Sequence, residues 1–343
     1  MSYFISLAIY VSAISTSTLF VFLSEYKKQF NKTSGLIAIL IPSLLAAFRQ
    51  SGIDYKSYLS IYNHFSRGFV YDIEIGWRWL NQISSSYEML LFISALVFFG
   101  ISFVAICKFV DKRRWVAWLS FIILCMPTFF NVMRQMVAVA VVFLGFAFLY
   151  NKKNISFIIC VFLGFLFHKS AIFILLIVPI YKFICKYIKT IEWFIVALSG
   201  IMVISVPLLE IIVAKLGMFE GYFTKDVSSI SFGFLLYTLP PLFFYYNKKS
   251  RLSSDSMLYF CIIIYLLVIP FQIIGNIVIY ADRLMLYFQP MICVAIPMII
   301  RGYDVMYKKH EVTKWYIIWF VIQYIILHLI MNSNGIYPYR MDF

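Results

Sequence analysis

Residues 88–107 have the sequence EMLLFISALVFFGISFVAIC, in which Glu88 carries the only charge. The hydrocarbon core of a bilayer is about 30 Å thick, and a helix needs roughly 20 apolar residues to cross it. This stretch therefore predicts a membrane-spanning helix. The whole chain has the same character, because 63% of its 343 residues are hydrophobic and 13% are charged, too few to cover a soluble fold of this length.

Apolar runs of similar character recur along residues 1–343 and leave no room for a sizeable soluble domain. We expect a single integral membrane domain, all-α and polytopic, with about 12 transmembrane helices, some of them short or re-entrant. Residues 115–150 would form one helix of about 54 Å, too long for a single crossing, so we expect a break near Pro127 and Asn131. The predicted spans are residues 2–23, 35–48, 88–107, 115–131, 132–150, 155–167, 170–181, 191–207, 232–246, 257–275, 284–300 and 315–332.

Most of the 29 Lys and Arg residues lie in alternate loops between these runs. Because basic loops face the cytoplasm, this pattern predicts the orientation of the chain, with both termini outside. It also explains the net charge of +14 without a nucleic-acid partner. Two basic loops, 151–154 and 182–190, must be joined by an even number of crossings, so we expect a hairpin that turns outside at residues 167–170. The other basic loops are 27–32, 108–114, 248–251 and 301–314.

Two longer loops are expected on the outer side. Residues 49–87 contain apolar side chains at helical spacing, which predicts an amphipathic helix lying in the membrane interface. These side chains are Tyr55, Tyr58, Leu59, Tyr62 and Phe65. Residues 208–231 contain charged residues and two glycines, and we expect a flexible cover over a site there.

Ionisable residues beside apolar spans are costly, so their positions are informative. Three arginines, Arg49, Arg134 and Arg283, recur at one predicted membrane depth. An Arg fork binds phosphate with two parallel hydrogen bonds, so the three would suit a lipid pyrophosphate. The alternative is that each reaches lipid headgroups or pairs with a nearby acid, namely Asp54, Glu74 or Asp282. The supporting or sugar-binding candidates around them are Gln50, Tyr55, Tyr58, Glu74, Arg78, Gln135, Lys169, Ser170, Tyr280, Asp282 and Tyr287.

His168 and Asp54 are the candidates for taking a proton from an attacking hydroxyl. The competing interpretations are a helix-turn histidine bonded to backbone carbonyls and an aspartate that caps the interfacial helix. Trp77 and Trp79 either stack on sugar rings or belong to an aromatic belt at the membrane interface, and we favour the belt. The scattered histidines and cysteines have no metal-ligand spacing, so we expect neither a metal site nor a cofactor.

Four short motifs carry a resemblance to a known family: FRQSGIDYKSY at 48–58, EIGW at 74–77, NVMRQ at 131–135 and FHKSA at 167–171. In their order and spacing they resemble the EpsG branch of Wzy-type polysaccharide polymerases. The resemblance implies a metal-independent membrane glycosyltransferase of the GT-C type in the bacterial plasma membrane, with its active site facing the periplasm or the outside. It would polymerise undecaprenyl-pyrophosphate-linked repeat units into O-antigen, capsule or exopolysaccharide.

By the same resemblance, Arg49, Arg134 and Arg283 would hold the donor pyrophosphate, while His168 or Asp54 would assist the acceptor hydroxyl. The implied partners are the lipid-linked donor and acceptor, the lipid bilayer, a co-polymerase that controls chain length and a flippase. Two alternatives stay open. One is a lipid-linked oligosaccharide flippase, which needs a charged path reachable from both sides. The other is an O-antigen ligase or acyltransferase, which would share the Arg and His chemistry but use another acceptor.

Overall fold

The computed structural model describes residues 2–26, 32–68, 72–187, 190–216, 233–247, 255–303 and 305–341, and all regular elements in these ranges are helical. The first half of the chain forms α1 (Tyr3–Tyr26), α2 (Lys32–Ala47), α3 (Tyr55–Ser66), α4 (Ile75–Ile83), α5 (Tyr87–Phe109), α6 (Arg114–Phe129), α7 (Met133–Tyr150), α8 (Asn154–Phe165) and the 3-10 helix η1 (Lys169–Leu176). The second half forms α9 (Ile177–Tyr187), α10 (Ile191–Leu216), α11 (Leu235–Thr238), η4 (Pro240–Leu242), α12 (Phe243–Tyr246), α14 (Ser256–Leu266), α15 (Val268–Ile274), η5 (Ala281–Tyr287), α16 (Pro290–Arg301), α17 (Met306–Tyr324) and the π-helical turn η6 (Ile325–Ile330).

The length and composition of these helices are those of a multi-pass membrane protein. Within the described residues, 7 helices are long and apolar enough to cross a membrane, or up to 8 if the bent pair η5 and α16 forms one span. Three further apolar helices, α2, α6 and α8, are shorter than a typical span. The number of helices long enough to cross is thus below the expected twelve. Several predicted spans form helices of only 12 to 16 residues, which are shorter than a typical span.

The two predicted breaks are present. α6 ends at Phe129 and α7 begins at Met133, while α8 ends at Phe165 and η1 begins at Lys169. The predicted span over residues 232–246 is not one continuous α-helix, because α11, η4 and α12 divide its described part around Pro240 and Pro241. A proline cannot donate a backbone hydrogen bond, so two in succession interrupt an α-helix. Of the second loop predicted on the outer side, residues 217–231 lie outside the described residues.

The described helices form two compact units, residues 1–174 with 296–343 and residues 175–295. In the first unit, α5 packs against α2 and α7, and α7 packs against α8. Small residues allow the last contact, since a Cβ on Gly145 would lie 3.0 Å from Cys160 Cβ. In the second unit, α15 packs against α10 and η5 around the buried residues Val206, Ile274 and Ile277.

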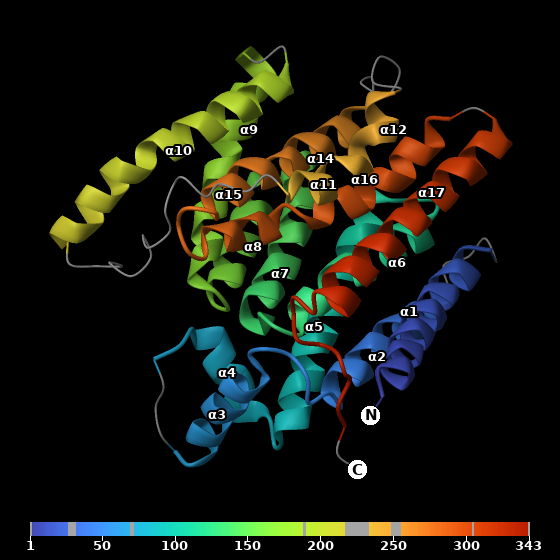
Figure 1. Cartoon of the computed structure of the whole chain (residues 1–343), viewed down its shortest axis with the longest axis vertical. Coiled ribbons are helices and arrows are strands. Elements are labelled where there is room, and N and C mark those ends of the chain that lie inside the picture. Colours follow the sequence, from blue (N-terminus) through green and yellow to red (C-terminus); the bar gives the residue numbers. More distant parts are fainter. Residues whose placement is uncertain are drawn as a thin grey trace. The chain divides into compact units, whose positions relative to one another are not determined.

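The first unit has two distinct ends. At one end, Glu25 after the apolar part of α1 accepts a hydrogen bond of 2.6 Å from the Arg114 amide, which begins α6. α6 contains 16 residues and so separates this end from its own far terminus by about 24 Å. At the far terminus lie α3 and α4, which form a small lobe beyond the ends of the longer helices (Figure 1).

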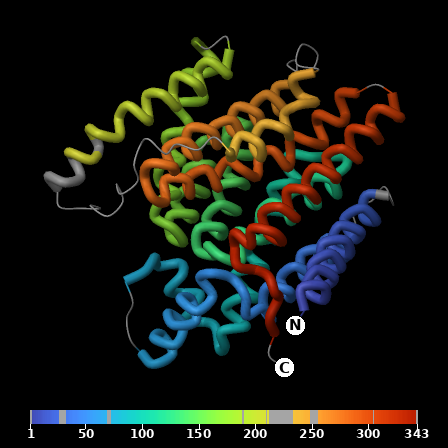
Figure 2. The backbone as a smooth tube through the Cα atoms, viewed as in Figure 1, coloured from blue at the N-terminus to red at the C-terminus, as the bar shows by residue number. Residues whose placement is uncertain are grey.

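A tail after α17 returns to this far end and lies beside α1 (Figure 2). Its backbone carbonyls accept hydrogen bonds from the loop after α2: the Gln50 amide donates to Arg340 O at 2.8 Å, and the Gly52 amide donates to Gly335 O at 2.9 Å. The buried Tyr339 hydroxyl donates to Leu45 O at 2.8 Å. Unpaired buried amides are costly, so the tail stabilises the conformation of the loop at residues 49–54.

Candidate functional site

An ion pair joins two of the sequence motifs at the far end of the first unit. Arg134 lies in the first turn of α7, and its Nη1 donates to Glu74 Oε2 at 2.6 Å. The side chains are 27% exposed for Arg134 and 10% exposed for Glu74, so the pair is largely shielded from solvent. Charge-assisted hydrogen bonds of this kind are short and strong. The alternative interpretation of Arg134, pairing with a nearby acid, therefore describes its conformation here.

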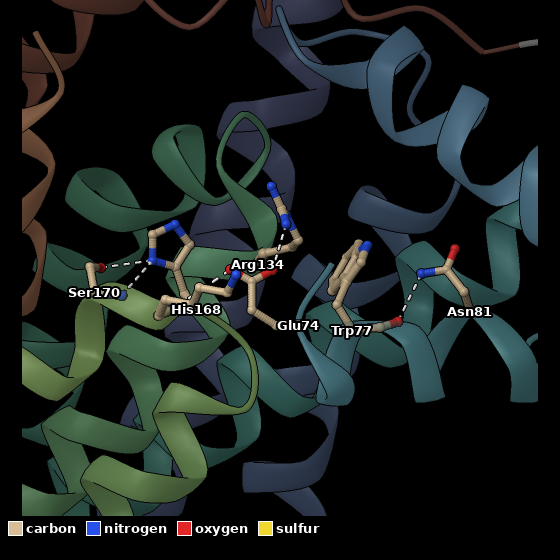
Figure 3. Close-up of polar contacts among 7 residues, drawn as sticks. Glu74, Trp77, Asn81, Arg134, His168 and Ser170 are labelled. Carbon is tan, nitrogen blue, oxygen red and sulfur yellow. Dashed lines mark hydrogen bonds and ion pairs between the residues drawn. The ribbon is translucent and has the colours of Figure 1, made fainter. Parts of the chain in front are cut away.

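Glu74 also reaches a third motif. Its Oε1 accepts a hydrogen bond of 3.4 Å from the backbone amide of Lys169, the first residue of η1 (Figure 3). A backbone hydrogen bond holds the start of α4 close to the end of α8, since the Gly76 amide donates to Leu166 O at 2.8 Å. Glu74 therefore connects the start of α7 to the turn that carries His168.

His168 is half-buried, and its Nδ1 lies 2.7 Å from the Ser170 hydroxyl oxygen. The hydroxyl can donate or accept, but the Ser170 backbone amide, 3.4 Å from Nδ1, can only donate. These partners assign Nδ1 as the acceptor and place the proton of the neutral ring on Nε2. In this tautomer the ring nitrogen that carries the proton is not the one that contacts Ser170.

Arg49 lies deeper than Arg134. Its side chain is 1% exposed, Nη1 donates to Ser51 O at 2.7 Å, and Nη2 lies 3.1 Å from Met133 Sδ. Its guanidinium carbon lies 4.7 Å from the centre of the Phe130 ring, a cation–π distance. The guanidinium thus contacts the loop after α2 and the start of α7, and this conformation does not present it to an external anion.

Asp54 directly precedes α3, but its carboxylate makes no capping hydrogen bond. Its backbone amide donates instead to Asn131 Oδ1 at 3.0 Å, which ties the first motif to the third. Among the residues that the structure describes, no hydrogen bond to the Asp54 carboxylate is present, and the residue is half-exposed. The carboxylate is therefore available as an acceptor, while the backbone that carries it is fixed.

Aromatic packing between α3 and α4 fixes the position of Glu74. Tyr58 and the fully buried Trp77 lie with ring centres 5.4 Å apart. The belt interpretation of Trp77 is therefore wrong, because Trp77 faces the inside of the small lobe; Trp79 is 57% exposed, as a belt residue would be. Burial raises the pKa of Tyr58, although the neighbouring Arg134 charge opposes this, so the phenol stays neutral beside the guanidinium.

The close approach at Gly76 leads to a testable expectation. A Cβ at this position would lie 2.8 Å from Leu166 O and 3.1 Å from Phe167 Cε1, too close for the backbone to stay in place. We expect Gly76→Ala to displace the start of α4 and separate Glu74 from Arg134, and so to lower the thermal unfolding midpoint of the protein. The measurement is thermal unfolding in detergent together with gel filtration. Gly100→Ala is the matched control, because nothing lies within 4 Å of a Cβ there, and equal unfolding midpoints of the two variants would contradict the expectation.

The remaining predicted site residues lie in different places. Gln135 is buried in the first turn of α7, and Arg78 lies in α4 one turn after Glu74. Tyr55 packs edge-on against Tyr87 with ring centres 5.3 Å apart. The predicted site residues between 280 and 287 belong to the second unit. There the Arg283 guanidinium lies 4.2 Å from the centre of the Tyr280 ring. Tyr287 is buried, and Asp282 packs against Gly275.

A model of the EpsG family matches residues 32–341. The chain belongs to the EpsG family. Membership links this EpsG-family protein to exopolysaccharide biosynthesis. No curated protein and no solved structure matches it.

The four EpsG-like motifs of the first unit meet through side-chain contacts. Arg49 contacts Met133, the Asp54 amide binds Asn131, and Glu74 joins Arg134 to the Lys169 amide. In this EpsG-family protein the sequence pattern did not single out Asn131, Met133 or Gly76 as members of the site, although all three lie inside the quoted motifs. A polar, small or flexible residue at a span end is the signal that would find them. Among the described residues, no group of three or more His, Cys, Asp or Glu side chains is arranged to hold a metal.

Proposed function

We propose that this protein polymerises polysaccharide by joining undecaprenyl-pyrophosphate-linked oligosaccharide repeat units at the outer face of the bacterial plasma membrane. The supporting observation is the convergence of four separate motifs on one cluster around the Glu74–Arg134 ion pair, at one end of a membrane-helix bundle. A partly exposed arginine beside a half-exposed carboxylate and an imidazole suits transfer from an anionic leaving group.

In the proposed reaction, a hydroxyl at the non-reducing end of one lipid-linked repeat attacks the anomeric carbon of the growing chain's lipid-linked sugar. A new glycosidic C–O bond forms as the bond from the anomeric carbon to the pyrophosphate oxygen breaks. The electron pair leaves with the polyprenyl pyrophosphate, and the hydroxyl proton passes to a base. Cations that hold the pyrophosphate make a proton donor to the leaving group unnecessary.

The geometry supports separate roles for the site residues. Arg134 uses one nitrogen of its fork for Glu74 and keeps a partly exposed side chain, so we assign it to the pyrophosphate. Arg283 belongs to the second unit and has no assigned role in this cluster. We assign His168, with its proton on Nε2, to donating a hydrogen bond to a phosphate oxygen. We assign the Asp54 carboxylate to the role of the base that takes the hydroxyl proton. Arg49 is buried, and we assign it to holding the loop that carries Asp54.

The proposal includes an architecture. The short helices α2, α6 and α8 would join the longer ones to give ten or eleven crossings, close to the predicted twelve, in a GT-C-like bundle with the basic loops in the cytoplasm. Polyprenyl tails would enter laterally from the bilayer, and the glycan would leave outward. A flippase would supply the lipid-linked repeats, and a co-polymerase would set chain length.

The test is a reconstitution of the purified protein in liposomes with a synthetic polyprenyl-pyrophosphate-linked repeat unit. We expect a ladder of products on a gel that differ by one repeat. Movement of the lipid-linked glycan to the opposite leaflet without elongation would replace the proposal by a flippase. Transfer of single chains to a different acceptor, with no ladder, would replace it by a ligase.

A further inference from the structure

A cationic pocket lies at the opposite end of the first unit from the candidate site. Its volume is about 200 Å³, the space of roughly seven water molecules. Lys112, Arg113, Arg301 and Lys309 line it together with Pro297 and Met306. The four cations come from three places in the chain: the turn between α5 and α6, the end of α16, and the first turn of α17. Concentrating so many like charges in one concavity is unfavourable unless an anion enters.

The chain conformation builds this pocket. Arg113 has a left-handed backbone, with φ of 63°, and its Nη1 donates to the Thr313 hydroxyl at 3.2 Å, which joins the start of α6 to α17. Thr313 in turn donates to Lys309 O at 2.6 Å. A non-glycine residue with positive φ is strained, so a surrounding structure must hold it there.

Two carboxylates among the described residues at this end of the unit are engaged elsewhere. Glu25 accepts the Arg114 amide, and Glu311 pairs with Lys314, which does not line the pocket. Within the described residues, the ammonium groups of Lys112 and Lys309 form no ion pair. Burial lowers the pKa of Arg113, with the Glu25 charge opposing it, so the guanidinium would gain from an added anion.

We propose that this pocket binds the phosphate headgroup of an anionic phospholipid on this side of the bilayer. Guanidinium and ammonium groups both donate hydrogen bonds to phosphate oxygens, and basic pockets at the ends of membrane helices recognise such headgroups. The apolar surroundings favour a lipid over a soluble phosphate. Met306 lines the pocket, and its neighbours Val305 and Tyr307 are strongly exposed, as residues that contact acyl chains or the interface would be.

The experiment is native mass spectrometry of the full-length protein in detergent with equal amounts of phosphatidylglycerol and phosphatidylcholine. Wild type should retain phosphatidylglycerol preferentially. In the double variant Lys112→Gln/Lys309→Gln, the affinity for phosphatidylglycerol should fall roughly thirtyfold, because two positive charges are removed from the pocket. The matched control Lys153→Gln/Lys314→Gln removes two exposed cations of the same unit outside the pocket and should behave as wild type.

Several outcomes would overturn the proposal. Equal retention of the two lipids, or equal losses in both double variants, would show that no specific headgroup site exists. Displacement of the lipid by millimolar inorganic phosphate, with equal binding of phosphate alone, would identify a soluble phosphate as the ligand. If the double variant does not fold, Lys112→Gln alone serves, because Lys112 is exposed and its loss of retention should still exceed that of Lys153→Gln.

Discussion

Arg134→Ala is expected to reduce formation of the polymer ladder at least a hundredfold. The substitution removes an arginine whose side chain is anchored by Glu74 and partly exposed at the site. One nitrogen of the guanidinium already binds Glu74, so an anion bound by the other loses its charge-assisted hydrogen bond and the nearby positive charge when the side chain is removed. The measurement is the initial rate of ladder formation in liposomes at matched protein levels, beside Arg67→Ala, an exposed arginine that follows α3.

A further variant separates chemistry from stability. Arg134→Ala alone leaves Glu74 largely buried without its partner, and breaking such a pair is destabilising. The double variant Glu74→Ala/Arg134→Ala removes both charges and is expected to unfold at a higher temperature than the single variant. If Arg134 acts on the pyrophosphate, the double variant stays inactive. Recovery of activity in the double variant would reduce Arg134 to a structural role.

Gly52→Ala is expected to destabilise the protein and abolish most of its activity. Gly52 has φ of +119°, and a Cβ there would lie 2.8 Å from Phe130 O and 3.2 Å from Arg49 Nη1. The backbone strain alone costs on the order of 1–3 kcal/mol, and the contact would also displace Arg49 from Phe130. The readouts are the thermal unfolding midpoint in detergent and the rate of ladder formation.

Gly68 provides the control for this prediction. It also has positive φ, +80°, but nothing lies within 4 Å of a Cβ built on it. Gly68→Ala should therefore show the strain without the displaced arginine, and we expect a small loss of stability with activity retained. Similar loss of activity in the two variants would contradict a specific role for the loop at residues 49–54.

The class of fold follows from the sequence because a bilayer imposes one strong constraint, the length of an apolar helix. The breaks after Phe129 and Phe165 followed from the same constraint, through a run that was too long and through two basic loops that had to face the same side. The number of spans did not follow. Helices α2, α6 and α8 are short, and their apolar composition does not show whether each one crosses.

The site was predicted in part, and its arrangement was not. Residue type and position at span ends identified Arg134, Glu74 and His168, but charge alone does not tell which acid an arginine meets. Arg49 and Arg134 differ in burial, and this difference assigns them different roles. The burial of Arg49 depends on its packing against Phe130 and Met133, which is a tertiary property. Trp77 shows the same limit, since an amphipathic residue at an interface and a buried one share the same local sequence.

The contact between the tail and the loop at residues 49–54 has a consequence for biogenesis. The carbonyls of residues 334–340 satisfy the amides of Gln50, Gly52 and Ile53, although nearly the whole described chain separates the two segments in order of synthesis. A ribosome translates α2 long before α17, so the loop waits for its partners while the intervening helices insert. A nascent chain halted before α17 would carry the Asp54 loop without its support, and the site would be completed only once α17 and the tail are in place.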